Sequence, residues 1–163
     1  MQRIICHIGI GSNIGDALQN CQRAVEEICH IETVSLIAHS SFYRTEPIGD
    51  IDQDYFVNAA VEIATTLQAR ELLKALEAVE RKMGRVRMLK GGPRIIDLDI
   101  LFYGQAVINE GDLVIPHPEL HRRRFVLAPL CEIASYVIHP VYGVSVRGLL
   151  DRLEDDKSVT KIE

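Results

Sequence analysis

The chain has 163 residues, of which 47% are hydrophobic and 25% are charged, and its formal net charge is −5 at pH 7. This length and composition are typical of one folded domain and exclude a disordered or fibrous chain. An acidic total argues against a general nucleic-acid surface, and no apolar run approaches the roughly 20 residues that span a bilayer. We therefore expect a single domain over residues 1–163 that binds neither nucleic acid nor membrane.

The start of the chain reads as a first strand rather than as a secretion signal. The sequence MQRIICHIGIGSN has no charged start followed by a long apolar segment and a cleavage site. The four cysteines form neither a CxxC pair nor a tight disulfide framework, and each falls in an apolar-periodic segment. We therefore expect a cytoplasmic protein with these cysteines reduced in its core: Cys6, Cys21, Cys29 and Cys131.

The first part of the chain alternates between strand and helix patterns. Residues 4–11 form an apolar strand pattern, and Asp16 followed by Gln19 resembles a capping box at the start of a helix. Residues 33–44 are rich in β-branched, small and aromatic side chains, and residues 55–66 repeat that composition after a polar loop. These two segments predict two strands paired as a hairpin.

A second helix is predicted over residues 67–83, where apolar residues recur at helical spacing. A basic loop with two adjacent glycines follows, and then a strand over residues 96–102. Beyond it, the sequence predicts a short strand at residues 106–109 and a helix at residues 125–134. Residues 144–153 are weakly amphipathic, and we expect the polar end of the chain to fray.

The predicted order β-α-β-β-α-β is that of a ferredoxin-like split βαβ unit. In this α+β fold both helices cover one face of an antiparallel sheet. Extra C-terminal elements follow the unit in this chain. We therefore expect the opposite face of the sheet to be open for a ligand.

Two neighbouring aspartates in the last strand of this unit form the strongest chemical signal. Asp97 and Asp99 alternate with Ile96, Leu98 and Ile100, so both carboxylates point to the same side of the strand. Their Cα atoms stand roughly 7 Å apart, which is close enough to bind one or two divalent cations. A hard cation such as Mg²⁺ removes the repulsion between the carboxylates and keeps waters and substrate phosphates as further ligands. The alternative is a pair of solvated acids.

A cluster of positive charge precedes the acid pair. Between residues 81 and 94 there is no acidic residue, and the basic side chains are Arg81, Lys82, Arg85, Arg87, Lys90 and Arg94. Polyphosphate oxygens bind both guanidinium groups and metals, so the two features together predict Mg-nucleotide chemistry. There is no P-loop spacing, and Gly9, Gly11 and Gly15 fit a tight turn better than a dinucleotide fingerprint.

Side chains on either side of this region are weaker candidates. Glu77 and Glu80 lie on the predicted helix that leads into the basic loop, where they are placed to accept hydrogen bonds from a base amine or a ribose. Most such acids are solvated. His117 lies between two prolines that hold its backbone rigidly, and a purely structural role is equally expected. Residues 121–124 form a second basic cluster, which offers either a phosphate contact or a solvated charge run.

The order of the motifs resembles that of a known enzyme family. Seven segments carry the resemblance over nearly the whole chain: Gly11-Ser12-Asn13, SSFYRTEPIG, QDYFVNAAV, GRVR, GGPRIIDLDIL, PHP and RRFVLAPLCEIA. In this order they resemble the 6-hydroxymethyl-7,8-dihydropterin pyrophosphokinases of folate biosynthesis. The resemblance implies a ferredoxin-like α+β fold. It also implies transfer of the β,γ-diphosphate of ATP to the pterin hydroxymethyl group, with release of AMP.

The resemblance also implies roles for individual side chains. It makes Asp97 and Asp99 the ligands of two Mg²⁺ ions, and Arg85 and Arg94 the arginines that clamp the transferring phosphates. The residues it implies on the ATP side are Glu77, Glu80, Arg87, Leu98, Ile100, His117 and Arg123. It implies a pterin pocket in which two phenylalanines sandwich the flat ring, formed by Gly11, Thr45, Pro47, Ile48, Phe56, Asn58 and Phe125.

Some positions depart from the family's pattern. The loop at residues 87–94 is one residue shorter than in other members and has no aromatic residue, and Phe56 and Pro118 stand where some members have tyrosine. Two alternatives stay open: another two-metal nucleotidyltransferase on the same scaffold, and a non-catalytic nucleotide or ligand sensor. In each case we expect a monomer whose partners are small molecules.

Overall fold

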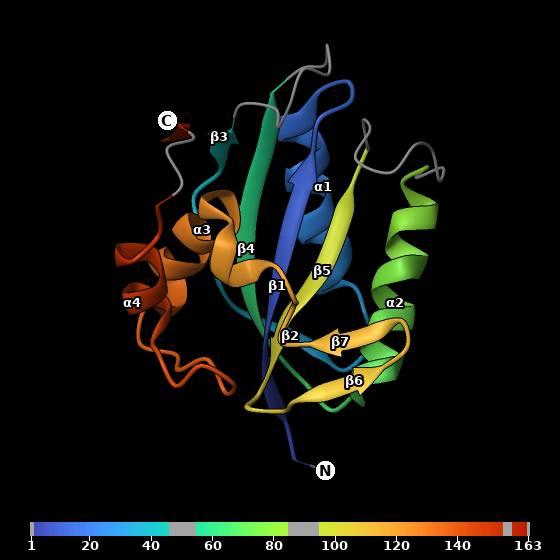
Figure 1. The fold of residues 1–163 in the computed structure, drawn as a ribbon. Helices are drawn as coiled ribbons and strands as arrows, with labels where there is room; N and C mark the ends of the chain where they lie inside the picture. Colours follow the sequence, from blue (N-terminus) through green and yellow to red (C-terminus); the bar gives the residue numbers. More distant parts are fainter. Residues whose placement is uncertain (1, 46–54, 85–94, 155–157, 163) are drawn as a thin grey trace.

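Three long antiparallel strands form most of the main sheet. The computed structural model of the chain describes residues 2–45, 55–84, 95–154 and 158–162. Strand β1 (Ile4–Ser12) lies between β4 (Phe56–Thr65) and β5 (Asp97–Tyr103) and pairs antiparallel with both (Figure 1). Strand β5 ends the path β5-β1-β4-β3-β8 and is therefore an edge strand of this sheet. The three predicted strands are confirmed to within a few residues at each end.

The predicted strand at residues 33–44 is in fact two strands. Both β2 (Val34–His39) and β3 (Tyr43–Thr45) pair antiparallel with β4, as predicted for a hairpin. Between them the Ser40 N–H donates to the Ala60 carbonyl, at 2.8 Å, and the Ala60 N–H donates to the Ser40 hydroxyl, at 2.9 Å. A serine side chain replaces a ladder contact there, so the strand is interrupted.

The expected fraying of the chain end is wrong for residues 159–161. These residues form β8 (Val159–Lys161), which pairs antiparallel with β3. The Ile162 N–H also donates to the Phe42 carbonyl at 2.8 Å. A short polar segment becomes ordered here because β3 offers it an unpaired edge, which the local sequence does not reveal.

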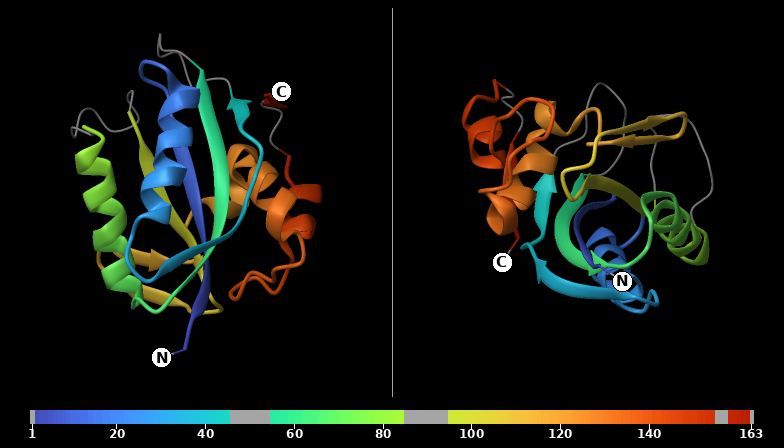
Figure 2. Two further views of the ribbon diagram at one scale, coloured as in Figure 1. Left: turned by 180° about the vertical axis from the view of Figure 1, so that it is seen from behind. Right: turned by 90° about the horizontal axis from the view of Figure 1, so that it is seen from below.

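Helices α1 (Ala17–Cys29) and α2 (Ala69–Lys82) pack on one face of the sheet, as predicted (Figure 2). The side chain of Asp16 caps α1 by accepting a hydrogen bond from the Gln19 N–H, at 3.1 Å. The core under these helices contains buried residues from both helices and from the sheet, including Cys21, Ile28, Leu72, Leu76, Val57, Ile63, Leu98 and Ile100. We call the opposite side, seen towards the viewer in Figure 1, the front face.

The front face is only partly open, which corrects the expectation of an uncovered surface. A second core covers it, with the buried residues Ala60, Leu101, Phe102, Leu120, Leu127, Leu130, Cys131, Ala134, Val146 and Leu149. The covering elements are η1 (Leu120–Arg122), α3 (Arg124–Ala134) and α4 (Val146–Asp151). The short strands β6 (Ile108–Glu110) and β7 (Leu113–Ile115) pack instead against the first core, through Leu113 and Ile115. The apolar side of α3 requires burial, and the sheet supplies the surface for it.

The cysteines follow the expectation at three of four positions. All four are free thiols; Cys6, Cys21 and Cys131 are buried, whereas Cys29 is exposed. Cys29 is the last residue of α1 and follows the fully buried Ile28, so its side chain lies on the exposed side of the helix. Burial raises the pKa of Cys6 and of Cys21 to about 12. Within the described segments, no helix is both long enough and apolar enough to cross a membrane.

Candidate active site

The two aspartates of β5 lie on the same side of the strand, as the alternation predicted. Ile96, Leu98 and Ile100 are buried, whereas Asp97 and Asp99 between them are only partly buried. The side chain of Asp99 keeps 43% of its surface exposed. The carboxylates therefore point to the front face, away from the core under α1 and α2.

The strand beside the acid pair carries glycines on the same face. Gly11 stands opposite Asp97 and Gly9 opposite Asp99 in the β1–β5 ladder. A methyl group at Gly11 would lie 3.0 Å from Nδ2 of Asn58, and one at Gly9 would lie 3.3 Å from the side chain of Leu101. A larger residue at either position would therefore require the neighbouring side chain, Asn58 or Leu101, to move.

His117 is held beside the acid pair by its backbone and by one ring nitrogen. Its N–H donates to the Leu101 carbonyl at 3.1 Å, and its Nδ1 accepts from the Glu119 N–H at 3.1 Å. Because Nδ1 accepts, the neutral ring carries its proton on Nε2, which lies 4.0 Å from Oδ2 of Asp99. Burial lowers the pKa of His117, and the charge of Arg123 lowers it further, against an opposing effect of Asp97.

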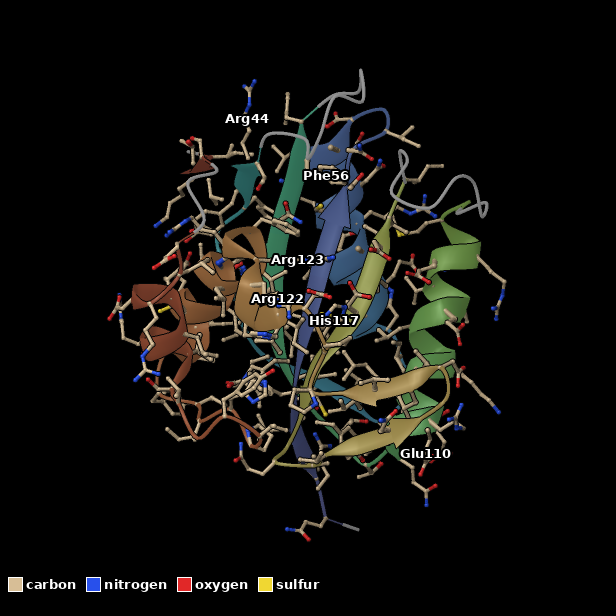
Figure 3. The ribbon with its side chains drawn as sticks, in the orientation of Figure 1. Arg44, Phe56, Glu110, His117, Arg122 and Arg123 are labelled. Carbon is tan, nitrogen blue, oxygen red and sulfur yellow. The ribbon has the colours of Figure 1, made fainter. Side chains whose placement is uncertain are left out.

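Arg123 is the N-cap residue of α3, and Phe125 lies in the first turn of that helix. The Arg123 carbonyl accepts the first hydrogen bonds of the helix, from Val126 at 3.0 Å and Leu127 at 2.9 Å. The guanidinium carbon of Arg123 lies 5.6 Å from the centre of the Phe125 ring. In Figure 3, Phe56, Arg123 and His117 follow one another downward over the front face. The start of α3 therefore places a cation, Arg123, and an aromatic ring, Phe125, on the same side of the sheet as the acid pair.

A polar row runs across the sheet from β3 to the acid pair. Tyr43 stands opposite Asn58, Asn58 opposite Gly11, and Gly11 opposite Asp97. Opposite residues in antiparallel strands project to the same face, so this row joins the predicted pterin residues to the predicted metal ligands. The hydroxyl of Thr45 donates to Oδ1 of Asn58 at 3.1 Å, which orients the amide of Asn58.

The predicted ATP-side residues of α2 and β5 differ in what they expose. Glu77 is half-buried, but Glu80 is buried, and its Oε2 accepts the Leu98 N–H at 2.8 Å. The side chains of Leu98 and Ile100 are buried in the core, which leaves only their backbone for contact with a nucleotide. Roles in ATP binding remain predictions for these four residues. The predicted residues Arg85, Arg87, Arg94, Pro47 and Ile48 lie outside the described segments.

Sequence reasoning missed a buried acid–imidazole pair on the front face. His7 and Glu62 stand opposite each other on β1 and β4, with 2.8 Å between Nε2 and Oε1. Burial lowers the pKa of His7, and the hydrogen bond to Glu62 opposes that effect. Each residue has apolar neighbours on both sides in its strand, so only the pairing register, which links residues 55 apart, brings the two together.

The fold and the front face define the class of the protein: a ferredoxin-like α+β domain with an acid pair on the sheet face opposite its two main helices. Residues 7–135 match the family described as 7,8-dihydro-6-hydroxymethylpterin-pyrophosphokinase (HPPK). The chain belongs to this family. It is 41% identical to the 2-amino-4-hydroxy-6-hydroxymethyldihydropteridine pyrophosphokinase of Methylorubrum extorquens, over 96% of this chain and 98% of that protein. Identity to the enzyme of that name from Haemophilus influenzae is 40%, over 96% and 97% of the two chains.

Other similar proteins are much longer than this chain. It is 38% identical to the folic acid synthesis protein fol1 of Pneumocystis carinii, but it spans only 20% of that protein. Among solved structures, wild-type Plasmodium falciparum HPPK-DHPS with pteroate superimposes with a TM-score of 0.75 at 15% identity. That match covers 93% of this chain and 42% of the Plasmodium chain. At this identity the superposition shows a shared fold.

Proposed function

We propose that this chain transfers the β,γ-diphosphate of ATP to the hydroxymethyl group of 6-hydroxymethyl-7,8-dihydropterin and releases AMP. Membership of the HPPK family and the names of the full-length relatives support this activity. The observation that carries the proposal is the position of Asp97 and Asp99. Both face the front of the sheet beside the glycines of β1, where a metal-bound phosphate chain fits without a competing side chain from that strand.

The acid pair suits Mg²⁺ rather than a softer metal. In the described segments, no three or more His, Cys, Asp and Glu side chains gather to hold a metal. Two carboxylates leave most of an octahedral shell to water and phosphate oxygens, which is the coordination that Mg²⁺ prefers. We propose two ions, both held by Asp97 and Asp99. When bound, Mg²⁺ neutralises charge on the phosphates and favours ionisation of an attacking hydroxyl.

The protein's own contribution is to position the reactants and to stabilise negative charge. Phosphoryl-type transfer requires little covalent chemistry from side chains. Arg123 places a permanent positive charge at the start of α3. The Nε2–H of His117 points towards Asp99. Because the pKa of His117 is lowered, the ring is neutral and can donate a hydrogen bond without adding a positive charge. The roles of Arg85, Arg87 and Arg94 on the phosphates belong to the same proposal.

The pterin is proposed to bind at the β3–β4 end of the polar row. Phe56 on β4 and Phe125 on α3 supply aromatic rings from two different elements, and such rings stack on a flat heterocycle. The Asn58 amide is held by Thr45 and offers donors and an acceptor to the edge of the ring. This arrangement sets the hydroxymethyl group towards Gly11 and the acid pair.

The product of the reaction tests the proposal directly. The purified chain is incubated with ATP, Mg²⁺ and the hydroxymethyl-dihydropterin, and the nucleotide products are separated by chromatography. We expect AMP, formed only when the pterin and the metal are both present. Release of pyrophosphate would instead identify a nucleotidyltransferase, and binding without any product would identify a sensor.

We further propose that residues 1–163 act as one catalytic domain, as a monomer in the cytoplasm. The free thiols support a reducing compartment. Light scattering after gel filtration tests the oligomeric state against the chain mass of 18.3 kDa. A mass of twice that value would contradict the monomer.

A further inference from the structure

Helix α3 is joined to the sheet by one carboxylate as well as by its apolar side chains. Oε1 of Glu132 accepts from the Tyr43 hydroxyl at 2.6 Å, and Oε2 accepts from the Ser41 N–H at 2.9 Å and the Ser41 hydroxyl at 3.1 Å. Burial alone would raise the pKa of Glu132, but these hydrogen bonds outweigh it and the pKa is lowered. Burial and the contact with Glu132 raise the pKa of Tyr43. An ionised acceptor therefore meets protonated donors, and such hydrogen bonds are strong.

The sheet end of this contact lies next to the proposed pterin residues. Ser41 is in the interruption between β2 and β3, and Tyr43 is the first residue of β3. Tyr43 stands opposite Asn58, and two residues later Thr45 stands opposite Phe56. The hydrogen bond from Tyr43 to Glu132 therefore lies on the strand that pairs with Asn58 and Phe56, two of the proposed pterin residues.

The helix end of the contact is on the same helix as Phe125, the other aromatic residue of the proposed pterin site. Glu132 follows Phe125 by seven residues, which is close to two turns of an α-helix, so both side chains lie on one face of α3. The next turns of α3 pack through Leu127, Leu130 and Ala134, which are fully buried. Apolar packing of this kind holds the helix on the sheet but is not directional. The hydrogen bonds of Glu132 are directional, so they fix where the helix lies along β3.

We propose that Glu132 is a positioning residue for the pterin, and that Tyr43 contributes only through its hydrogen bond to Glu132. The carboxylate holds α3 in the register with β3 that sets the Phe125 ring across from Phe56. Neither Glu132 nor Tyr43 needs to touch the substrate. This inference rests on the proposed function, because it assigns the two phenylalanines to the pterin.

Kinetics with each substrate varied in turn test the inference. In Glu132→Ala we expect the KM for the pterin to rise about tenfold, since small misplacements of a bound reactant are costly, while the KM for ATP stays within about twofold. Glu132→Gln keeps one acceptor oxygen and should fall between the wild type and Glu132→Ala. Tyr43→Phe should raise the pterin KM less than Glu132→Ala does, and the double variant should be no worse than Glu132→Ala alone.

A matched control and a second measurement separate the possible outcomes. Glu26→Ala removes an exposed glutamate from α1, on the other side of the sheet, and should change neither KM. Pterin dissociation constants from calorimetry should follow the same order as the KM values. Equal weakening of both substrates, or a lower melting temperature with an unchanged pterin KM, would overturn the positioning role. A wild-type chain that neither binds pterin nor forms AMP would overturn the proposed function itself.

Discussion

The carboxylate of Glu80 accepts a hydrogen bond from the backbone N–H of Leu98, with 2.8 Å between Oε2 and N. Leu98 lies between Asp97 and Asp99 on β5, the edge strand of the sheet. The backbone groups on the outer side of an edge strand have no neighbouring strand to pair with. Glu80 of helix α2 therefore supplies the hydrogen-bond acceptor that the edge strand lacks at Leu98, between the two aspartates.

Replacing Glu80 should affect stability and metal-dependent activity together. Glu80→Ala leaves a buried N–H without its acceptor, so we expect the free energy of unfolding to fall by about 1–3 kcal/mol. Activity should require more Mg²⁺, because the strand that holds the acid pair is less well fixed. Glu80→Gln keeps an acceptor oxygen and should cost less in both measurements. Urea denaturation and Mg²⁺ titrations of AMP release provide the two readouts.

A lysine on the same helix provides the control for Glu80. Lys74 is exposed on α2, and Lys74→Ala should leave both the stability and the Mg²⁺ requirement unchanged. If Glu80→Ala were as stable as Lys74→Ala and bound Mg²⁺ equally well, the hydrogen bond to Leu98 would have no role in fixing the strand.

The local pattern of the sequence was sufficient for much of the fold. The helix predicted over residues 67–83 is found at Ala69–Lys82, and the strand predicted over residues 55–66 is found at Phe56–Thr65, because periodicity is a property of neighbours in sequence. The break at Ser40, the pairing of β8 and the covering of the front face by α3 depend on distant segments. No local window contains that information.

The same limit applies to the candidate site. Alternation along β5 predicted correctly that Asp97 and Asp99 share a face. The position of Gly11 opposite Asp97 follows from the pairing register of β1 and β5, which the sequence does not specify. The contacts of Glu132 join residues 91 and 89 apart in sequence. Chemistry within one strand could be predicted, whereas the supporting contacts between elements could not.

Removing either aspartate should abolish turnover without unfolding the chain. Asp97→Ala and Asp99→Ala each remove one of the two proposed metal-binding carboxylates, and we expect AMP release to fall by at least about 10³-fold. Both side chains are only partly buried, so the fold should persist. In thermal unfolding, Mg²⁺ with ATP should raise the melting temperature of the wild type but not of these variants.

An aspartate outside the site provides the comparison. Asp112 lies in the turn between β6 and β7 and pairs with Arg70 on the surface, at 3.0 Å. Asp112→Ala should retain both AMP release and the increase in melting temperature with Mg²⁺ and ATP. Near-normal turnover by Asp97→Ala and Asp99→Ala would refute the assignment of the metal ligands.

Two neighbouring glycines of β1 should respond differently to a methyl group. In Gly11→Ala the new Cβ would lie 3.0 Å from Nδ2 of Asn58, so that side chain must move. We expect the pterin KM to rise about tenfold, because the Asn58 amide is displaced from its place in the proposed pterin site. In Gly9→Ala the new Cβ meets buried Leu101 at 3.3 Å, and we expect a loss of about 1–3 kcal/mol in stability.

The two glycine variants serve as controls for each other. Gly9→Ala should leave the pterin KM within about twofold of the wild-type value, since its methyl group meets the core and not Asn58. Pterin KM values and urea midpoints are measured for both variants. A pterin KM that rises equally in both variants would argue against a specific role for Asn58.

Three histidines, two of them buried and one partly buried, should make the protein less stable below neutral pH. Burial is the main cause that lowers the pKa of His7, His117 and His139 from 6.5. The unfolded chain then binds protons at a higher pH than the folded chain does. Stability is therefore complete above about pH 6.5 and falls as the pH drops towards the folded-state pKa values, by up to roughly 1.4 kcal/mol per pH unit for each histidine. Urea denaturation at pH 7.5, 6.5 and 5.5 measures this slope.

His139 allows one part of that slope to be isolated. Its Nδ1 accepts from the Val141 and Tyr142 N–H groups, each at 3.2 Å, so a proton on that nitrogen would break both hydrogen bonds. In His139→Asn the side-chain oxygen can still accept, but the titrating group is gone. We expect the variant to lose less stability than the wild type between pH 6.5 and 5.5, by up to about 1.4 kcal/mol over that unit. Parallel slopes for the two proteins would show that His139 takes up its proton equally in the folded and unfolded states.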